Sequence, residues 1–384
     1  MTKMNYENLR NFLQEEKKYP KCKKIKRCPL IHEGFPGTFN LSFAEYDTLN
    51  EFGRYTNFDH DFIFSTIQSC LRPQDLLENI KQNLNLWKYL SVFEMSDIIG
   101  QIILKEEKVK EVHSFQLKRL INILTKLGLK KENIFPSYHR GGKISEITEG
   151  KYCFDFVVPE DTFTKEQFIK VGIPKENLIP DSTRDTFLSL HLHMPTPWGY
   201  RNEINYNIGT QENPILLDIA TLEYFLWEPV YSSETEVSKN IIGLKPIKNT
   251  VSVGGIGVER LCMAINNLKE IQEVDYLHKF YDNLKLIYPN LTKEEGIKFG
   301  ESLRALHRIF SDIESNKINH LGSNRKNKIK WFLQILFEYV KEFNEEELSK
   351  LLKVHSEVQP WHKNLLKGIK PTIERIETYY SNKK

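Results

Sequence analysis

The chain has 384 residues, of which 40% are hydrophobic and 27% charged, as in folded globular proteins large enough for more than one domain. Aromatic residues make up 12% of the sequence, which argues against a largely disordered chain. The formal net charge of +3 neither requires nor excludes a nucleic-acid partner, because a local basic face can form within a nearly neutral total.

The cysteines and the hydrophobic segments indicate the compartment. The cysteines are scattered without a C-x-x-C pair and predict no disulfide framework: Cys22, Cys28, Cys70, Cys153 and Cys262. The N-terminal segment lacks the apolar core of a signal peptide, and no stretch approaches the roughly 20 apolar residues that span a bilayer. We therefore expect a cytoplasmic protein with no membrane partner.

The first part of the chain predicts a charged helix followed by strands. Residues 1–30 end in a basic connector, KCKKIKRC, which is more typical of a solvated surface than of a nucleic-acid contact. Two strands are predicted within residues 59–104, DFIFSTIQSCLR and YLSVFEMSDIIGQIIL, joined by a long polar segment. Such a loop favours an antiparallel hairpin over a βαβ crossover. Apolar residues at helical spacing then predict an amphipathic helix over 106–129.

The remainder changes from strands to helices. Between residues 151 and 264, four segments are typical of strands: KYCFDFVV, NEINYNI, ILLDIATLEYFLW and NTVSVGGIGV. After Leu261 the apolar spacing becomes helical in every long segment. We therefore predict an α+β domain with an antiparallel sheet flanked by helices over 1–268, and an all-helical domain over 269–384.

The segment VSVGGIGVERLCMAINN could bind a phosphate. A strand enters a glycine turn, and Gly255 and Gly257 would let a ligand approach the backbone just before a helix that begins near Arg260. No Gly-Lys-Ser/Thr follows, so the turn is not a P-loop. Alone, it is more typical of a structural turn, because glycine-rich strand-to-helix turns are common.

A second segment, residues 70–100, places an arginine beside an aromatic residue. Arg72 ends one predicted strand, and strand alternation puts Phe93 and Met95 on one face of the next, with Glu94 on the other. Without further context, Arg72 could be a solvated residue and Phe93 part of the core.

Together the two segments resemble motifs 2 and 3 of class II aminoacyl-tRNA synthetases. The sequences CLR, FEM, GIPKENLI and GIGVERL are similar to the alanyl-tRNA synthetase family, as are NEI with Tyr206 and ILLDIATLEYF, and they occur in the family's order. Residues 305–336 resemble the family's helical tRNA-recognition domain. The likeness covers about residues 59–340, and GTFNLSFAEYDTL is the candidate for the first motif of the class.

The resemblance implies activation of a small amino acid with ATP and Mg²⁺. The protein would neutralise charge that develops as the amino-acid carboxylate attacks the α-phosphate. Arg72 would contact that phosphate and the carboxylate, Arg260 the adenine or the terminal phosphate, and Phe93 the other adenine face. Asp218, and less strongly Glu203, are the candidates for holding Mg²⁺. The implied ATP contacts are Arg72, Phe93, Met95, Gly255, Gly257 and Arg260.

The substrate pocket departs from the family. The aspartate that pairs with the substrate ammonium falls at Val253, and the family's tryptophan, asparagine and valine fall opposite Ala220, Thr221 and Glu223. Thr221 and Glu223 share a strand face, so both could line the pocket. Glu223 is either a substitute partner for the ammonium or a residue that faces solvent or pairs with a basic neighbour.

Further departures concern zinc and tRNA. His191 and His193 form a close pair, but without a Cys or a third His the sequence does not favour zinc. The family's arginine-rich helix is replaced by WFLQILFEYV, with the basic residues just upstream: Arg325, Lys326, Lys328 and Lys330. We therefore expect tRNA to be a weaker partner. The family's editing and C-terminal tRNA-binding domains are expected to be missing.

Two functions remain open. One is an AMP-forming amino-acid ligase that transfers to a tRNA 3′ end or to a substitute acceptor, and the other is a non-catalytic paralogue that binds tRNA or an amino acid as a regulator. Retention of Arg72, Arg260 and Phe93 favours the enzyme, because a regulator need not keep phosphate contacts. The oligomeric state is left open.

Overall fold

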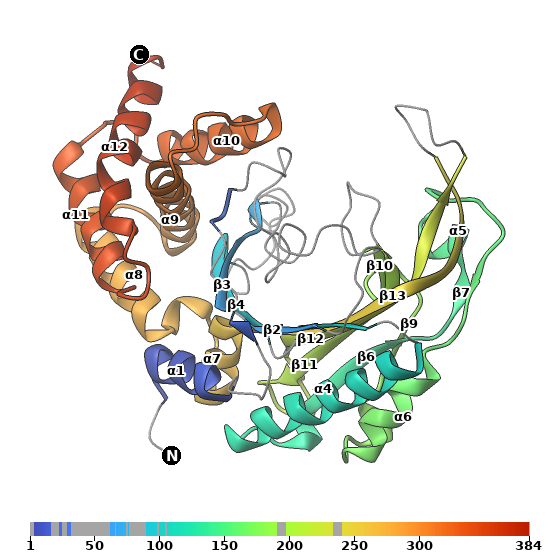
Figure 1. Cartoon of the computed structure of the whole chain (residues 1–384). Helices are drawn as coiled ribbons and strands as arrows, with labels where there is room; N and C mark the ends of the chain where they lie inside the picture. Colours follow the sequence, from blue (N-terminus) through green and yellow to red (C-terminus); the bar gives the residue numbers. More distant parts are fainter. Residues whose placement is uncertain are drawn as a thin grey trace.

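The computed structural model describes residues 4–16, 23–24, 29–31, 62–65, 67–73, 76, 90–97, 100–103, 106–189, 197–232 and 240–383. Within them the chain forms an 11-stranded sheet, a two-stranded sheet and helices on one face and at one end (Figure 1). The strands are β1 (Lys23–Lys24), β2 (Phe62–Ser65), β3 (Ile67–Leu71), β4 (Val92–Asp97), β5 (Gly100–Ile103), β6 (Ile134–His139), β7 (Gly142–Lys143), β8 (Val157–Val158), β9 (Ile179–Asp181), β10 (Phe187–Ser189), β11 (Trp198–Asn207), β12 (Leu216–Tyr231) and β13 (Ile241–Gly257). The α-helices are α1 (Tyr6–Glu16), α4 (Glu106–Lys126), α5 (Ile144–Ile147), α6 (Thr162–Lys170), α7 (Val258–Asn266), α8 (Asp275–Ile287), α9 (Lys293–Asn316), α10 (Ser323–Tyr339), α11 (Glu345–Glu357) and α12 (Leu365–Ser381).

The large sheet is mixed rather than purely antiparallel. Its order is β1-β2-β5-β13-β12-β11-β6-β9, with β10 on β11 and the β3–β4 hairpin on β13. The pairs around β12 and β13 are antiparallel, as predicted, but β1–β2 and β6–β9 are parallel. The chain between β6 and β9 passes through α6, a crossover of the kind that parallel strands need. The alternation of apolar and polar residues within one segment does not indicate which distant strand that segment pairs with, or in which direction.

The predicted elements are found with shifted bounds. The two strands predicted within 59–104 are divided into four, β2 to β5. KYCFDFVV forms strand only at Val157–Val158, because most of that segment is bends and loop. The helix predicted over 106–129 ends at Lys126, and α6 was not predicted, whereas α12 lies in the segment predicted to be all-helical.

One face of the sheet is covered by helices. α4 packs on β12 and β13, and α6 packs on α4 and β6 (Figure 1). Strand alternation sends Leu222 and Tyr224 of β12 into this buried layer, where the His113 ring of α4 lies 4.3 Å from the Tyr224 ring. Thr221 and Glu223 alternate with these two residues along β12, and their side chains therefore rise from the opposite face.

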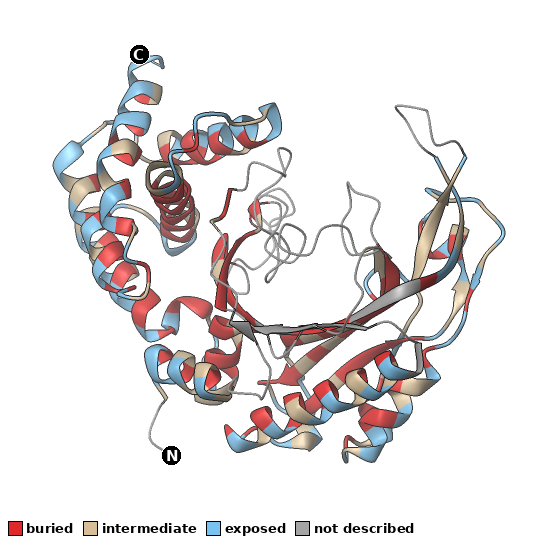
Figure 2. Cartoon of the chain, viewed as in Figure 1, coloured by how far each residue is buried: buried red, intermediate tan, exposed pale blue. Residues whose placement is uncertain are grey.

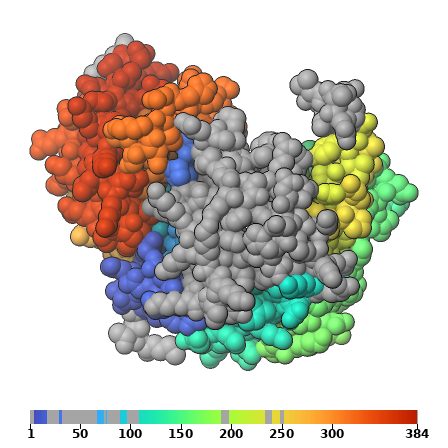
Figure 3. Space-filling view, viewed as in Figure 1, coloured from blue at the N-terminus to red at the C-terminus, as the bar shows by residue number. Residues whose placement is uncertain are grey.

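The helices α8 to α12 form a second hydrophobic core at the end of the sheet. α9 is the most buried of them and packs against α8, α10, α11 and α12 (Figure 2). Leu71 and Val92 of the β3–β4 hairpin belong to this same cluster. In the space-filling view these red and orange helices lie on the opposite side of the molecule from the yellow end of β13 (Figure 3).

The predicted boundary between residues 268 and 269 falls between α7 and α8 and stays a prediction. None of the described helices has the length and apolarity that a membrane crossing requires.

Candidate active site

Most of the predicted site residues lie on the sheet face that α4 does not cover. Directly paired residues form two rows across β11, β12 and β13. The rows are Glu203–Thr221–Gly255 and Arg201–Glu223–Val253. Directly paired residues in an antiparallel sheet point to the same face. The shared face predicted for Thr221 and Glu223 is thus present, and it extends to the neighbouring strands.

A β-bulge brings Asp218 onto this face. The β11–β12 register shifts between Ile204 and Asn205, so that Asn205 pairs with Asp218 and Ile219 is the extra residue. In a regular strand Asp218 would point away from Thr221, because the two are an odd number of residues apart. The extra residue reverses that orientation. Burial follows the shift, since Ile219 is buried and Asp218 is half-buried.

Asp218 binds the arginine of the glycine turn. The Nη1 atom of Arg260 lies 2.7 Å from Asp218 Oδ2, with side chains that are 24% and 40% exposed respectively. Arg260 stands in the first turn of α7, whose N-cap is Gly257. Among the residues that the structure describes, a Cβ atom at Gly257 would meet only Arg260 Cβ and Ile219 O, both at 3.9 Å. Packing alone therefore does not require glycine there, whereas a ligand lying on the backbone would.

The face carries more carboxylates than it can keep ionised easily. Burial, and then the nearby charge of Asp218, raise the pKa of Glu203 to about 8. Burial also raises the pKa of Glu223, against the opposing influence of Arg201 and Arg72. The Nε atom of Arg201 lies 2.9 Å from Glu203 Oε1. Such a site favours an additional positive charge, whether a cation or an ammonium group.

Thr221 also has a polar group that could contact a ligand. Its Oγ1 atom is buried and has no hydrogen-bond partner in the part of the chain that the structure describes. A buried hydroxyl without a partner costs free energy, so it is expected to meet a ligand or water. It lies in the strand between Asp218 and Glu223.

The β3–β4 hairpin extends the same face. Met95 pairs with Gly257, and Cys70 pairs with Phe93. The Arg72 guanidinium lies 5.1 Å from the centre of the Phe93 ring, and its Nη2 atom donates to Met95 Sδ at 3.7 Å. The positive charge of Arg72 also opposes the rise in the pKa of Glu223 on β12.

Ala220 is the predicted pocket residue that the structure places elsewhere. It pairs with Ile256, is only 2% exposed and belongs to the core between the sheet and its helices. It neighbours Thr221 in sequence, and alternation therefore sends its side chain to the opposite face. We correct the prediction accordingly: Ala220 is a core residue.

One residue of this face and one irregularity of its strands were missing from the prediction. Arg201, which pairs with Glu223 and contacts Glu203, was not singled out, although its position two residues before Glu203 was a usable signal of a shared face. The bulge at Ile219 had no signal in the sequence.

The residues predicted to hold Mg²⁺ are a pair of carboxylates. Within the described residues no group of three or more His, Cys, Asp or Glu side chains is arranged to hold a metal ion. Glu203 lies opposite Thr221 and Asp218 lies opposite Asn205 in the β11–β12 pair, and the charge of Asp218 helps to raise the pKa of Glu203. His191 and His193 lie outside the described residues, as does the candidate first motif GTFNLSFAEYDTL.

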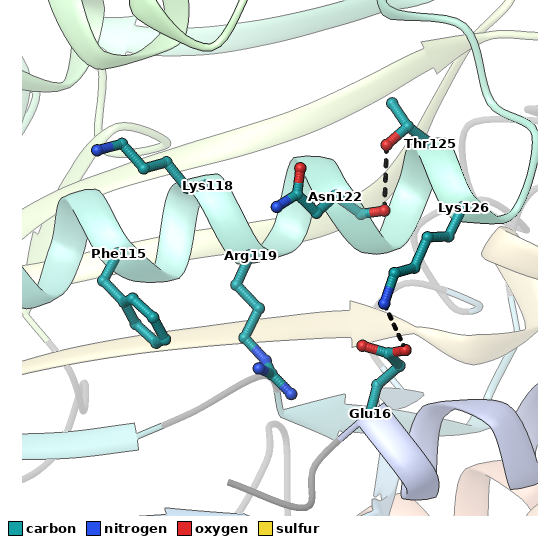
Figure 4. A pocket seen from close by; sticks show the side chains of 7 residues that line it. All are labelled: Glu16, Phe115, Lys118, Arg119, Asn122, Thr125 and Lys126. Atoms are coloured by element: carbon teal, nitrogen blue, oxygen red, sulfur yellow. Dashed lines mark hydrogen bonds and ion pairs between the residues drawn. The ribbon is translucent and has the colours of Figure 1, made fainter.

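A separate cavity of about 420 Å³ lies along the outer side of α4 (Figure 4). Its lining residues are Glu16, Phe115, Lys118, Arg119, Asn122, Thr125 and Lys126. An ion pair of 2.8 Å joins Lys126 to Glu16, so the end of α1 closes one side. Because α4 packs on the far face of the sheet, this cavity is separate from the site described above.

Comparisons with known proteins identify no family for this chain. No protein-family model and no curated protein sequence matches the chain. One similar solved structure is the aspartyl-tRNA synthetase of Entamoeba histolytica, with 15% sequence identity and a TM-score of 0.32. The match covers 69% of this chain and 54% of that one, so the chain spans about half the length of that protein. The specific resemblance to alanyl-tRNA synthetases finds no support in these comparisons.

Proposed function

We propose that the chain activates an amino acid with ATP, forming an aminoacyl-adenylate and pyrophosphate on the open face of the sheet. The observation that carries the proposal is the convergence of Arg72, Arg260 and Glu223. Arg260 is held by Asp218 beside the β12 row, and the charge of Arg72 reaches Glu223. A reaction between two anions needs such fixed positive charge, and an amino-acid substrate also needs a carboxylate for its ammonium group.

The residues would divide the reaction between them. A carboxylate oxygen of the amino acid attacks the α-phosphorus of ATP, and the bond to the β-phosphate oxygen breaks as pyrophosphate leaves. Arg72 would neutralise charge at the α-phosphate, and the Phe93 ring beneath it offers a stacking surface for adenine. Arg260 would bind the outer phosphates at the start of α7, where no side chain caps the first turn.

The Asp218–Glu203 pair fits Mg²⁺ by its chemistry. Magnesium is commonly held by one or two carboxylates together with substrate phosphates, and it would supply neutralising charge beside the pyrophosphate group. The raised pKa of Glu203 supports such a fit, because it reflects a buried carboxylate close to that of Asp218, whose effect the contact with Arg201 at 2.9 Å only partly offsets. We propose this pair as the magnesium ligands.

The substrate ammonium would lie between Glu223 and Thr221. Glu223 supplies negative charge and Thr221 a hydroxyl that accepts no hydrogen bond from the described residues. Which amino acid fits, and whether the acceptor is a tRNA 3′ end, a carrier or a metabolite, are questions for substrate screening.

The test is exchange of labelled pyrophosphate into ATP with Mg²⁺ and a panel of amino acids, including those whose amine is further from the carboxylate. Exchange that depends on one amino acid supports the proposal. Folded protein that binds ATP normally yet gives no exchange with any of them would contradict it and favour a non-catalytic binding protein.

A further inference from the structure

The outer edge of β4 is bound by helix side chains instead of a strand. β4 pairs with β3 from Val92 to Ser96, but with β13 only from residue 95 onward. The backbone N–H of Ser91 donates to Glu301 Oε2 at 2.8 Å, and Arg304 Nη2 donates to the carbonyl of Val92 at 3.2 Å. Both side chains come from α9. They therefore satisfy the polar backbone groups that a missing strand would have paired.

A second helix continues this pattern. The backbone N–H of Glu94 donates to both carboxylate oxygens of Glu259, at 3.0 and 3.2 Å. Glu259 belongs to α7 and directly precedes Arg260 in the chain. Its Oε1 atom also accepts from the hydroxyls of Tyr6, at 2.9 Å, and Tyr276, at 2.7 Å. The glutamate is thus fixed by three donors from three other elements.

These charged groups are buried where ordinary packing would not place them. Glu301, Arg304 and Glu259 are each no more than 1% exposed. Glu301 and Arg304 form an ion pair of 2.5 Å, and the Tyr281 hydroxyl donates to Glu301 Oε1 at 2.6 Å. A buried ion pair contributes little net stability compared with apolar packing. Such groups do fix the orientation of the backbone that they contact, since each carboxylate accepts from a defined backbone N–H.

The strand edge leads directly to the site. The backbone N–H of Arg72 donates to the carbonyl of Ser91 at 3.0 Å. Because Glu301 accepts from the backbone N–H of Ser91, it fixes the residue to which the Arg72 backbone is bound. Glu259 accepts a hydrogen bond from the backbone N–H of Glu94. The preceding residue, Phe93, makes the cation–π contact with the Arg72 guanidinium. Glu259 therefore links the hairpin to α7, which carries Arg260, and Glu301 fixes the start of β4 to α9.

We propose that Glu301 and Glu259 are positioning residues that set the β3–β4 hairpin, with Arg72 and Phe93, at the separation from Arg260 that ATP requires. The inference rests on the proposed function for its kinetic consequence. It makes α9, which lies outside the sheet domain, part of the scaffold of the ATP site. Neither glutamate touches a substrate.

The experiment uses the full chain with Glu301→Gln and Glu259→Gln, each of which puts an amide N–H where an acceptor is needed. Glu314→Gln on the exposed side of α9 is the matched control. Backbone hydrogen exchange is measured at Ser91 and Glu94, with Cys70 and Phe93 in the hairpin ladder as internal references. We expect exchange at Ser91 or Glu94 to quicken at least about tenfold in the corresponding variant. We also expect kcat/KM for ATP to fall at least tenfold while KM for the amino acid changes less than twofold.

Other outcomes decide against the inference. Unchanged exchange at Ser91 and Glu94 overturns it whatever the activity, and so does an equal loss for ATP and amino acid, which marks general destabilisation. If the native chain shows no pyrophosphate exchange, the proposed function fails separately. In that case, weaker binding of a fluorescent ATP analogue with quickened amide exchange still supports the positioning role, and unaltered binding overturns it. Should Glu301→Gln not fold, Arg304→Lys, which keeps the charge but loses the planar fork, replaces it.

Discussion

Glu223 and Val253 are direct partners across the antiparallel β12–β13 pair, so their side chains rise side by side from the open face of the sheet. Directly opposed residues have Cβ atoms about 4.5–5.5 Å apart. The resemblance places an ammonium-binding aspartate at Val253, and in this chain the carboxylate stands on the neighbouring strand. A carboxylate displaced by one strand suggests a substrate whose amine lies differently relative to its carboxylate.

The first prediction concerns this displaced carboxylate. Replacing Glu223 by Gln is expected to weaken binding of the amino acid by about 2 kcal/mol, the scale for losing one charged hydrogen-bond partner. Affinity for ATP should stay unchanged. Michaelis constants for both substrates in pyrophosphate exchange measure this. The double variant Glu223→Val with Val253→Asp returns a carboxylate to the same face and should shift preference towards an α-amino acid. An unaltered amino-acid constant in Glu223→Gln would remove Glu223 from the pocket.

The second prediction concerns the two arginines. Replacing Arg72 or Arg260 by Ala should reduce amino-acid-dependent pyrophosphate exchange at least about 10²-fold, as for the loss of one charge-stabilising donor. Lys118→Ala, on the outer side of α4, is the control for surface charge and should retain full exchange. Near-native exchange in either arginine variant would mean that this arginine does not contact the phosphates.

The third prediction follows from the carboxylate pair. The pKa of Glu203 is raised by burial and by Asp218 to about 8, whereas an unfolded chain has a glutamate pKa near 4.3. The stability that this group contributes is therefore fully present below about pH 4.3 and is lost as pH rises through about 8. Glu203→Gln, which stays neutral, should have a higher Tm than the native chain at pH 9 and a similar Tm at pH 5. For a chain of 384 residues, an unfolding entropy of about 2.1 cal/mol/K per residue means that a gain of 1 kcal/mol raises Tm by roughly 1 °C.

Thermal unfolding in buffers without divalent cations provides the measurement. Glu374→Gln, an exposed position on α12, should shift Tm equally at both pH values. A Tm difference for Glu203→Gln that does not grow between pH 5 and pH 9 would show that Glu203 is ionised throughout.

The fourth prediction concerns nucleic acid. Of the basic residues at the start of α10, Arg325 is 1% exposed, and burial, followed by Arg325, lowers the pKa of the half-buried Lys328. Only Lys326 and Lys330 of that group are exposed. We therefore expect weak tRNA binding through this helix, with a logarithmic salt slope of about 2 that falls by about one for each of these lysines replaced by Ala. Filter binding over a range of salt concentrations measures it, and tight, steeply salt-dependent binding to an alanine-type acceptor stem would contradict it.

The sequence by itself determined the α+β class, the position of the hairpin and the glycine turn, and the helices of the C-terminal half. These features depend on local periodicity, which a single segment carries in full. It also predicted that Thr221 and Glu223 share a face, because two residues of one strand separated by one position must do so.

Only the tertiary structure decided which strands lie side by side and where alternation is interrupted. The parallel β6–β9 pair joins segments that are far apart in the chain, and the bulge at Ile219 turns Asp218 toward Arg260. The same holds for Glu301, which lies within a helical apolar pattern yet accepts from the N–H of Ser91. Pairing register and long-range hydrogen bonds depend on how whole elements pack together, and no local pattern of residues specifies them.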